Sequence, residues 1–274
     1  MRRIAMNIFT EIAKSYKIID FHMHPYSNHA ENICSYKDSI GMTPADMAAD
    51  MERCGISRWC GSVIDCSHKG EEYGNDFKLT AILNDRVMEL AKADPRLIPG
   101  IHIHPSFPEE SYAEIERAYA AGVRMVGELV PYIKGWRDYS DPALFDCFEL
   151  AGRLGMVVSY HSMDDDQMEA MIKAHPHTIF VAAHPGERMN YLKHLERLCK
   201  YENAYLDISG TGLFRYGMLA HGVKTVGSER ILFGSDYPVC SPGMNIGGVL
   251  YEKLAEDDYE NIFHRNAERL LGLS

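Results

Sequence analysis

The sequence contains no run of the ~20 consecutive apolar residues that a membrane-spanning helix requires. Its first twenty residues carry Thr10, Glu11 and Lys14 where a secretory signal would have an uninterrupted apolar segment, so we expect no signal peptide. The seven cysteines are scattered and form no C-x-x-C pair, which argues against both a zinc ribbon and a disulfide framework. These absences favour a soluble protein in a reducing, cytoplasmic compartment.

Basic residues are also scarce: 28 lysines and arginines against 39 aspartates and glutamates give a formal net charge of −11 at pH 7. A field of this sign repels phosphate backbones and anionic lipids, so we expect neither nucleic acid nor a membrane as a partner. The G-x-G-x-x-G fingerprint of dinucleotide-binding proteins is absent as well. A small-molecule substrate is therefore the partner we expect, and the sequence leaves open whether the chain forms a homo-oligomer.

What the sequence does contain is a regular alternation of short apolar runs with longer segments of helical periodicity. The runs follow one another at intervals of about 30 residues, the length of one strand, one crossover helix and two loops. This period predicts a parallel sheet. The eight runs are Lys17–Phe21, Ser57–Cys66, Leu97–His104, Val123–Leu129, Met156–His161, Thr178–His184, Ala204–Ser209 and Arg230–Ser235.

Helix signals separate these runs. Thr43 stands before a proline and three residues ahead of Asp46, which is typical of a capped helix start, and Asp141 precedes a second proline in the same way. Isoleucines at helical spacing over residues 4–12 predict a short N-terminal helix before the first strand. Glycines suited to ending helices before the next strand are Gly55, Gly122 and Gly155.

Eight strands that alternate with helices close most simply into a (β/α)₈ TIM barrel, an α/β architecture of roughly 250 residues. We expect one domain over residues 1–274, because no glycine- or serine-rich linker interrupts the chain. The alternative is a doubly wound open sheet, which usually has fewer strands and a glycine-rich first turn. The first turn here, DFHMHPYSN, has no glycine, which favours the barrel.

Polar side chains of metal-ligand type follow five of these runs. Because the carboxyl ends of all barrel strands open at one mouth, such residues converge there from distant parts of the sequence. His22 and His24 are two apart, so on an extended strand both imidazoles point to the same side and can reach one cation. Asp236 follows an uncharged run, where a carboxylate is costly unless it is paired or bound to a metal. The full set is His22, His24, Glu128, His161, His184 and Asp236.

The segments IIDFHMHP and FGSDYP, the histidines that end the fifth and sixth runs, and NIFHRNAERLLGL near the end together resemble the amidohydrolase superfamily, in particular its amidohydrolase-2 branch. The resemblance extends over residues 18–273 and implies a metal-dependent TIM-barrel hydrolase. It also implies that His184 is either a ligand or a catalytic base that polarises the substrate carbonyl. The metal ligands that it implies are His22, His24, His161 and Asp236.

Glu128, at the end of the fourth run, has two alternative interpretations. Family members with two metals often bridge them with a carboxylated lysine or a glutamate from this strand, so the resemblance allows a binuclear site with His161 and His184 on the second ion. Otherwise Glu128 pairs with Lys134 or Arg124, and the remaining ligands hold one ion. Imidazole and carboxylate ligands suit divalent ions, with Zn²⁺ our first expectation and Mn, Fe, Co and Ni also compatible.

Three further residues are candidates for substrate binding. His104 belongs to a second H-x-H pair in the third run, and we expect it to face the mouth, with a structural role as the alternative. Arg215 follows the seventh run and could clamp a substrate carboxylate through its two-pronged guanidinium, unless it forms a surface ion pair. Tyr237 could line an apolar pocket wall or serve as a packing residue.

Because a metal-bound water becomes hydroxide near neutral pH, the sequence predicts a hydrolase that cleaves an amide, lactone or ester bond of a small, carboxylated molecule. Asp236 would accept the proton of the attacking water and pass it to the leaving group, and His184 or a second metal would stabilise the oxyanion. The first alternative is a metal-dependent non-oxidative decarboxylase related to aminocarboxymuconate semialdehyde decarboxylase, which fits a single metal. The others are a phosphodiesterase or deoxyribonuclease, which the net charge disfavours, and a metal-binding protein without catalysis.

Overall fold

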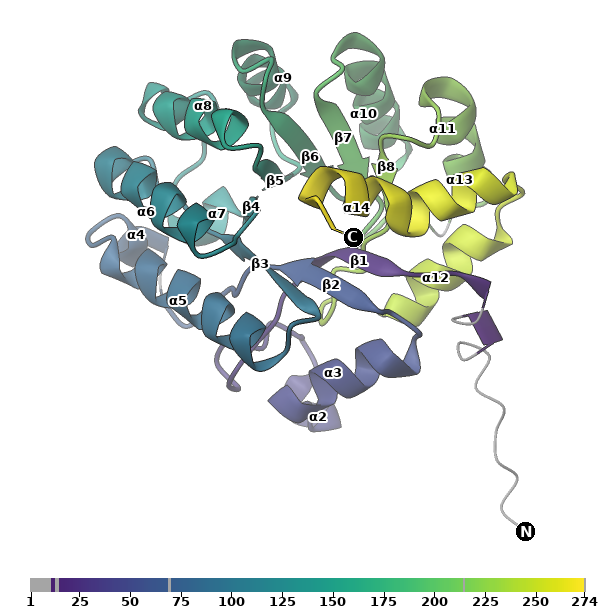
Figure 1. Ribbon diagram of the computed structural model, residues 1–274, viewed down its shortest axis with the longest axis horizontal. Helices are drawn as coiled ribbons and strands as arrows, with labels where there is room; N and C mark the ends of the chain where they lie inside the picture. Colours follow the sequence, from purple (N-terminus) through teal and green to yellow (C-terminus); the bar gives the residue numbers. More distant parts are fainter. Residues whose placement is uncertain (1–10, 13–14, 69, 214, 274) are drawn as a thin grey trace.

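The computed structural model describes residues 11–12, 15–68, 70–213 and 215–273, and its eight strands form one sheet in sequential order. Neighbouring strands pair in parallel, and the sheet curves into a barrel with helices around it (Figure 1). The predicted TIM barrel is confirmed, and the open doubly wound sheet is excluded. Most of the helix predicted over residues 4–12 lies outside the described residues. The strands are β1 Ile19–Met23, β2 Arg58–Gly61, β3 Leu97–Ile101, β4 Met125–Leu129, β5 Val157–His161, β6 Ile179–Ala183, β7 Ala204–Asp207 and β8 Ile231–Leu232.

Backbone hydrogen bonds join the first strand to the segment that follows the last strand. The N–H of Phe21 donates to the carbonyl of Phe233 at 2.9 Å, and the N–H of His24 donates to the carbonyl of Tyr237 at 2.7 Å. Strand β8 itself has only two residues. The residues after β8 therefore bring the two ends of the sheet together.

Helices connect the strands on the outside of the barrel, and their starts follow the sequence signals. Asp46 accepts hydrogen bonds from the N–H and the hydroxyl of Thr43, at 2.6 and 2.8 Å, and the first of these is the bond that the N3 carboxylate makes in a capping box. Asp141 accepts from the N–H of Ala143 at 2.9 Å. The helix-ending glycines Gly55, Gly122 and Gly155 have φ of 76°, 97° and 66°. The helices are α2 Lys37–Ile40, α3 Pro44–Arg53, α4 Gly70–Tyr73, α5 Lys78–Ala93, α6 Pro108–Ala120, α7 Pro131–Lys134, α8 Phe145–Arg153, α9 Asp165–Ala174, α10 Arg188–Lys200, α11 Met218–Val226, α12 Pro242–Tyr251, α13 Glu256–Glu260 and α14 Asn266–Leu271, with a 3₁₀ turn at Pro142–Leu144 and a π turn at Asn261–Arg265.

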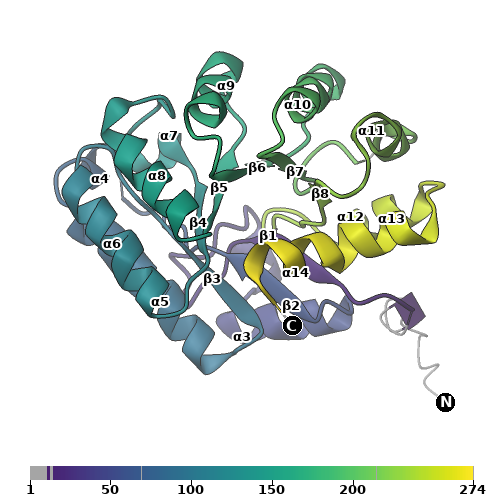
Figure 2. The same cartoon turned by 45° about the horizontal axis from the view of Figure 1, so that its top comes forward.

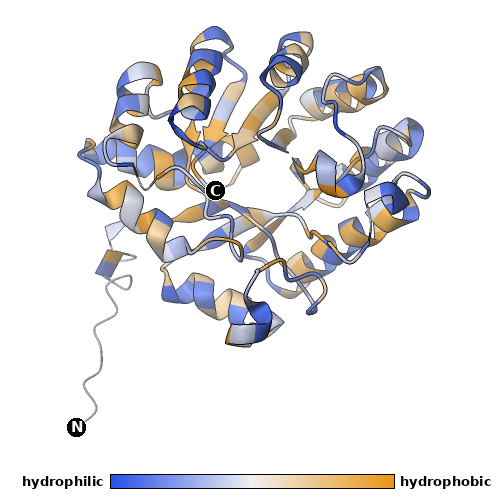
Figure 3. Ribbon diagram, turned by 180° about the vertical axis from the view of Figure 1, so that it is seen from behind, coloured by the Kyte–Doolittle hydropathy of each residue, from blue (hydrophilic) through white to orange (hydrophobic). Residues whose placement is uncertain are grey.

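Apolar side chains of the strands fill the inside of the barrel, and colouring by hydropathy shows apolar strands surrounded by helices with hydrophilic outer faces (Figure 3). Ala267 and Leu271 of α14 pack against this cluster, and α14 lies beside β1 in the tilted view (Figure 2). Because α14 covers the amino-terminal ends of the strands, the opposite mouth is the end left for polar side chains. Within the described residues, no helix is both long and apolar enough to cross a membrane. The strand members of the cluster are Ile19, Phe21, Cys60, Met125, Val157, Val181, Tyr205 and Leu232.

Candidate metal centre

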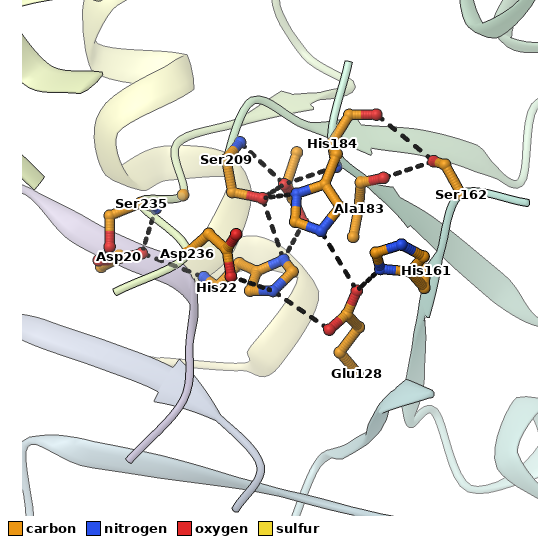
Figure 4. A network of polar contacts seen from close by, with 12 residues as sticks. Asp20, His22, Glu128, His161, Ser162, Ala183, His184, Ser209, Ser235 and Asp236 are labelled. Atoms are coloured by element: carbon orange, nitrogen blue, oxygen red, sulfur yellow. Dashed lines mark hydrogen bonds and ion pairs between the residues drawn. The ribbon is translucent and has the colours of Figure 1, made fainter. Parts of the chain in front are cut away.

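The six side chains that the sequence marks as metal ligands meet at the carboxyl-terminal mouth of the barrel, and Figure 4 labels five of them, all except His24. The ring centroids of His22 and His184 lie 5.0 Å apart, and those of His161 and His184 lie 4.8 Å apart. Strands far apart in the sequence thus contribute to one polar cluster. Its members come from the ends of β1 (His22 and His24), β4 (Glu128), β5 (His161) and β6 (His184) and from the segment after β8 (Asp236).

The carboxylate of Glu128 lies in the middle of this cluster and divides it into two sets. Its Oε2 lies 3.4 Å from Nε2 of His22 and 3.3 Å from Nε2 of His24. Its Oε1 lies 2.9 Å from Nδ1 of His161 and 3.6 Å from Nε2 of His184. The side chain is 4% exposed, so these histidines are its immediate surroundings.

The two cations considered as partners of Glu128 are engaged elsewhere. Nζ of Lys134 lies 4.1 Å from the centroid of the Tyr73 ring. Arg124 donates to the carbonyls of Tyr119 and Val123, at 3.1 and 2.8 Å. The contacts that the structure shows for Glu128 are therefore with imidazoles.

The first set has the spacing of a metal site. Ligands that surround a tetrahedral ion at ~2.0–2.1 Å stand about 3.3–3.4 Å from one another. The Nε2 atoms of His22 and His24 are 3.3 Å apart, and Glu128 Oε2 lies at 3.4 and 3.3 Å from them. Oδ1 of Asp236 lies 3.4 Å from Nε2 of His24 and 3.8 Å from Nε2 of His22. Two imidazoles and two carboxylates at this spacing fit a divalent ion.

The second set consists of Glu128, His161 and His184, whose ligand atoms all lie within 4.8 Å of one another. It is more open than the first, because the side chains of His161 and His184 are 24% and 15% exposed against 2% for His22. The ring of Tyr132 stands edge-on to His161, with centroids 5.3 Å apart. Three protein ligands beside an open position are typical of a catalytic rather than a structural ion.

The carboxylates of the cluster raise the pKa of the neighbouring imidazoles. Burial alone would lower the pKa of His22, but the carboxylates of Asp207 and Glu128 raise it well above its usual value. Burial likewise opposes protonation of His24, yet hydrogen bonds to Asp236 and Glu128 raise its pKa to about 9. Burial would raise the pKa of Glu128, but the charge of His22 and the hydrogen bond from His161 keep it well below the ordinary range. The Glu128 carboxylate therefore remains ionised and favours positive charge beside it, which protons or a divalent ion can supply.

Local backbone irregularities set the direction of two of these side chains. The register of β1 against β2 shifts between Asp20 and Met23, and that of β4 against β5 shifts between Val126 and Leu129. The second shift contains Gly127, whose φ is 102° and where a Cβ atom would lie 2.0 Å from the carbonyl oxygen of Ser159. Only glycine fits that position. Irregularities of this kind re-aim side chains next to functional sites.

Two residues of the cluster have an unusual backbone conformation. His184 and Asp236 have φ of 68° and 62°, and they are the non-glycine residues with positive φ in the described part of the chain. This conformation costs a residue other than glycine of order 1–3 kcal/mol and is found mainly where the surrounding structure holds it for a function. Both residues were singled out from the sequence as candidate catalytic groups.

Sequence reasoning missed Asp207 and Ser209, at the end of β7. Oδ2 of Asp207 lies 2.9 Å from Nδ1 of His22, and Ser209 Oγ lies 3.0 Å from Nδ1 of His184 while it donates to Asp207. These contacts hold both rings by Nδ1 and leave their Nε2 atoms towards Glu128. Such partners orient metal-binding imidazoles and fix their tautomer.

Asp20 is the other residue that sequence reasoning missed. It is fully buried under the cluster and accepts hydrogen bonds from the N–H of Ser235 at 2.9 Å and of His22 at 3.2 Å. Burial raises its pKa to about 7, although these hydrogen bonds oppose the rise. Asp20 thus ties the end of β1 to the segment that carries Asp236.

The three predicted substrate contacts lie away from the cluster. His104 is buried, and its Nε2 donates to the carbonyl of Lys134 at 2.9 Å. Tyr237 directs its hydroxyl towards Asp50, at 3.0 Å, on the far side of the segment after β8. Arg215 is half exposed and forms an ion pair with Glu187. None of the three lines the cavity described next, so their roles in substrate binding stay predictions without a supporting contact.

A cavity of about 400 Å³ opens above the cluster and is lined by five of its members, a size that suits a small molecule. A larger hollow of about 730 Å³ lies behind Tyr237 and Cys240 and includes no member of the cluster. We take the smaller cavity as the candidate substrate site, because it contains the groups that can do chemistry. The members that line it are His24, Glu128, His161, His184 and Asp236.

A family model described as Amidohydrolase matches residues 19–273. The chain belongs to the amidohydrolase-2 family. The resemblance found in the sequence is thereby confirmed. No curated protein matches this family member.

Solved structures with the same fold include enzymes of two kinds. An uncharacterised TIM-barrel protein from Bordetella bronchiseptica is 20% identical, with 94% of this chain and 99% of the other covered and a TM-score of 0.74. A dihydroxybenzoic acid decarboxylase from a Polaromonas species, with bound manganese and the inhibitor 2-nitroresorcinol, is 16% identical, with 94% and 97% covered and a TM-score of 0.66. A Pseudomonas putida protein with a proposed 2-pyrone-4,6-dicarboxylic acid hydrolase activity is 16% identical, with 94% and 98% covered and a TM-score of 0.65. At these identities the likeness shows the fold alone.

Proposed function

We propose that this chain is a metal-dependent hydrolase that cleaves an amide, lactone or ester bond of a small molecule with a metal-activated water. The observation that supports the proposal is the position of Glu128, whose two carboxylate oxygens face different histidine pairs at 2.9–3.6 Å. A carboxylate in this position can bridge two ions, an arrangement that clamps the attacking and leaving oxygens of a displacement. The ligands of one ion would be His22, His24, Glu128 and Asp236, and those of the other Glu128, His161 and His184.

When bound, divalent ions lower the pKa of a coordinated water towards ~7 and polarise the bond under attack. Asp236 is the residue we assign to proton transfer, because its carboxylate lines the cavity beside the cluster and can take a proton from water and return it to the leaving group. His184 lines the same cavity, and burial lowers its pKa, so its ring is neutral at pH 7. We assign His184 either to stabilising the oxyanion or to binding the second ion.

The number of bound metals tests the bridging role. We expect the protein purified without chelator and reconstituted with Zn²⁺ or Mn²⁺ to hold two equivalents by emission spectroscopy, and Glu128→Gln to hold one. A matched control is Glu149→Gln, because Glu149 also contacts a histidine, His175, at 2.9 Å, but on the outside of the barrel. The control should hold two equivalents. One equivalent in the parent protein would contradict the bridged site.

Turnover tests the reaction. A set of small amides, lactones and esters, assayed with added Zn²⁺ or Mn²⁺, should contain a substrate that Asp236→Asn fails to hydrolyse while it retains metal. Asp50→Asn is the matched control, because Asp50 contacts the hydroxyl of Tyr237 away from the cluster. Removal of proton transfer costs about 10²–10⁴-fold in rate. Full turnover by metal-loaded Asp236→Asn would refute the assignment.

The second candidate function is metal-dependent non-oxidative decarboxylation. The observation in its favour is that Nε2 of His22, Nε2 of His24 and Oε2 of Glu128 lie 3.3–3.4 Å from one another, with Oδ1 of Asp236 3.4 Å from His24, so that one ion could be held without the second set. The manganese-containing decarboxylase of the same fold is consistent with this alternative. Three results together would favour the decarboxylase over the hydrolase. The protein would hold one equivalent of metal, it would release CO₂ from hydroxybenzoic acids, and it would not cleave esters or lactones.

A further inference from the structure

The cavity above the cluster has two unlike walls. Because the strands follow one another around the barrel in sequence order, residues that follow β5, β6 and β7 lie on one side of the mouth. That side is polar and uncharged, and it is formed by Ser162, Asn190, His194 and Thr211. The other side follows β8, β1, β2 and β4, and it is mainly aliphatic, formed by Ile33, Ile64, Val130, Ile133 and Val239 together with Tyr132 and Cys240.

The polar wall is fixed in an uncharged state. Nη1 of Arg197 donates to Nδ1 of His194 at 2.9 Å, so the ring carries its proton on Nε2, which lies 3.1 Å from Oγ of Ser162. Ser162 in turn donates to the carbonyl of Ala183, as Figure 4 shows. Burial and the charge of Arg197 lower the pKa of His194 to about 3. The wall therefore offers hydrogen bonds and no charge at any physiological pH.

Within the described residues that line the cavity, the ionised groups apart from imidazoles are the carboxylates of Glu128 and Asp236. No lysine or arginine is among them. The nearby basic side chains have other partners: Arg197 faces Asp165 at 2.8 Å as well as Nδ1 of His194, and Lys134 lies over the ring of Tyr73. A carboxylate on the substrate would find a cation at the metal cluster and none elsewhere in the cavity.

We propose that the substrate is uncharged at every position away from the group that reacts at the metals, and that this uncharged part has a hydrocarbon side and a hydrogen-bonding side. The inference rests on the proposed function for the reacting group alone. An anionic group at the far end would lose water against aliphatic side chains without an ion-pair partner, which is strongly unfavourable. A substrate with one carboxylate can place that carboxylate on the metals, whereas the second carboxylate of a dicarboxylate would have no ion-pair partner in the cavity. This proposal replaces the carboxylate clamp that was expected at Arg215.

Binding of two probes of equal length tests the proposal without turnover. Hexanohydroxamic acid and adipic monohydroxamic acid both present a metal-chelating hydroxamate, and they differ at the far end, which is a methyl group in one and a carboxylate in the other. On the Zn²⁺-loaded protein at pH 7.5, titration calorimetry should give a dissociation constant at least tenfold lower for the methyl probe. Equal affinities, tighter binding of the carboxylate probe, or binding of neither would overturn the proposal.

A gained cation should reduce the preference. Thr211 lies at the exposed rim of the polar wall, so Thr211→Lys should tighten the carboxylate probe about two- to fivefold relative to the methyl probe. Thr225→Lys is the matched control, because Thr225 is exposed on α11 outside the cavity, and it should leave the ratio of the two dissociation constants unchanged. An unchanged ratio in Thr211→Lys would overturn the proposal. If the methyl probe binds preferentially while no amide, lactone or ester is turned over, the cavity inference stands and the proposed hydrolase fails.

Discussion

Replacing Lys134 with methionine should stabilise this protein, and the gain should depend on pH. The amine of Lys134 is 2% exposed and has no hydrogen-bond acceptor, and its one described polar contact is with the face of the Tyr73 ring. Burial lowers its pKa from 10.5 to about 7. The unfolded chain therefore binds a proton below about pH 10.5, whereas the folded chain binds one only below about pH 7.

The magnitude follows from this difference. Between these two pH values the unfolded state binds more protons, so the stability of the native protein falls as the pH decreases from 10.5 to 7. Each pKa unit corresponds to about 1.36 kcal/mol, so burial of the Lys134 amine costs on the order of 5 kcal/mol at pH 7. Methionine has a similar length and no charge, so Lys134→Met should recover several kcal/mol at pH 7, less about 1 kcal/mol for the lost cation–π contact.

Urea unfolding followed by circular dichroism at pH 7 and at about pH 9.5 measures the effect. The stability difference between variant and parent should shrink by about 3 kcal/mol at the higher pH, because the free energy of protonating the unfolded lysine falls by about 1.36 kcal/mol per pH unit while the folded amine stays neutral. Lys92→Met, at an exposed position of α5, is the matched control and should change stability by less than about 0.5 kcal/mol at either pH. The reasoning would be refuted if Lys134→Met were no more stable than the parent at pH 7, or if the gain in stability were the same at both pH values.

Three further outcomes follow from the contacts. Asp207→Asn should weaken metal binding by about 10–100-fold in a competition titration with a chelator, because it removes the carboxylate that holds Nδ1 of His22; unchanged affinity would exclude this orienting role. Arg215→Ala should leave kcat/KM within about threefold, because an exposed ion pair with Glu187 is worth about 0–1 kcal/mol, and a large loss would restore Arg215 as a substrate contact. Thr43→Ala should lower the free energy of unfolding by about 1 kcal/mol through the loss of the cap of α3, with Thr225→Ala as the control for a helical threonine.

The strands and several helix ends could be predicted because their signals are local. Each apolar run is long enough for a buried parallel strand, and the order of the runs allows few other topologies. The hydroxyl of Thr43 and the carboxylate of Asp46 are three residues apart, so the sequence alone places them in contact. The convergence of His22 with His184 followed from one added fact, that all strands of a parallel barrel end at the same mouth.

The missed residues carried a signal that went unused. Asp207 stands between Leu206 and Ile208 at the end of the seventh run, the same setting that drew attention to Asp236. What the sequence could not supply is that its partner is Nδ1 of His22, because that contact depends on how β7 and β1 face each other across the barrel. An aspartate that ends a barrel strand is thus a candidate support for a ligand as well as a ligand.

His104 and Tyr237 were expected at the substrate site but do not line the cavity. The sequence pattern does not show where their side chains point. His104 belongs to an H-x-H pair like that of His22 and His24, and the pattern alone cannot distinguish them. The difference lies at the end of α7, where the carbonyl of Lys134 accepts a hydrogen bond from Nε2 of His104 and so gives that ring a partner away from the cluster. Tyr237 likewise follows Asp236 directly, but neighbouring residues here point to opposite sides of the segment, and its hydroxyl meets Asp50.

The left-handed backbone at His184 and Asp236 limits how this barrel can be engineered. Glycine adopts positive φ more readily than histidine or aspartate does, so a library selected for heat resistance with no demand for turnover would accumulate glycine at these two positions. The selected variants would be more stable and would lack activity. Engineering for thermal stability should therefore keep His184 and Asp236 unchanged from the start.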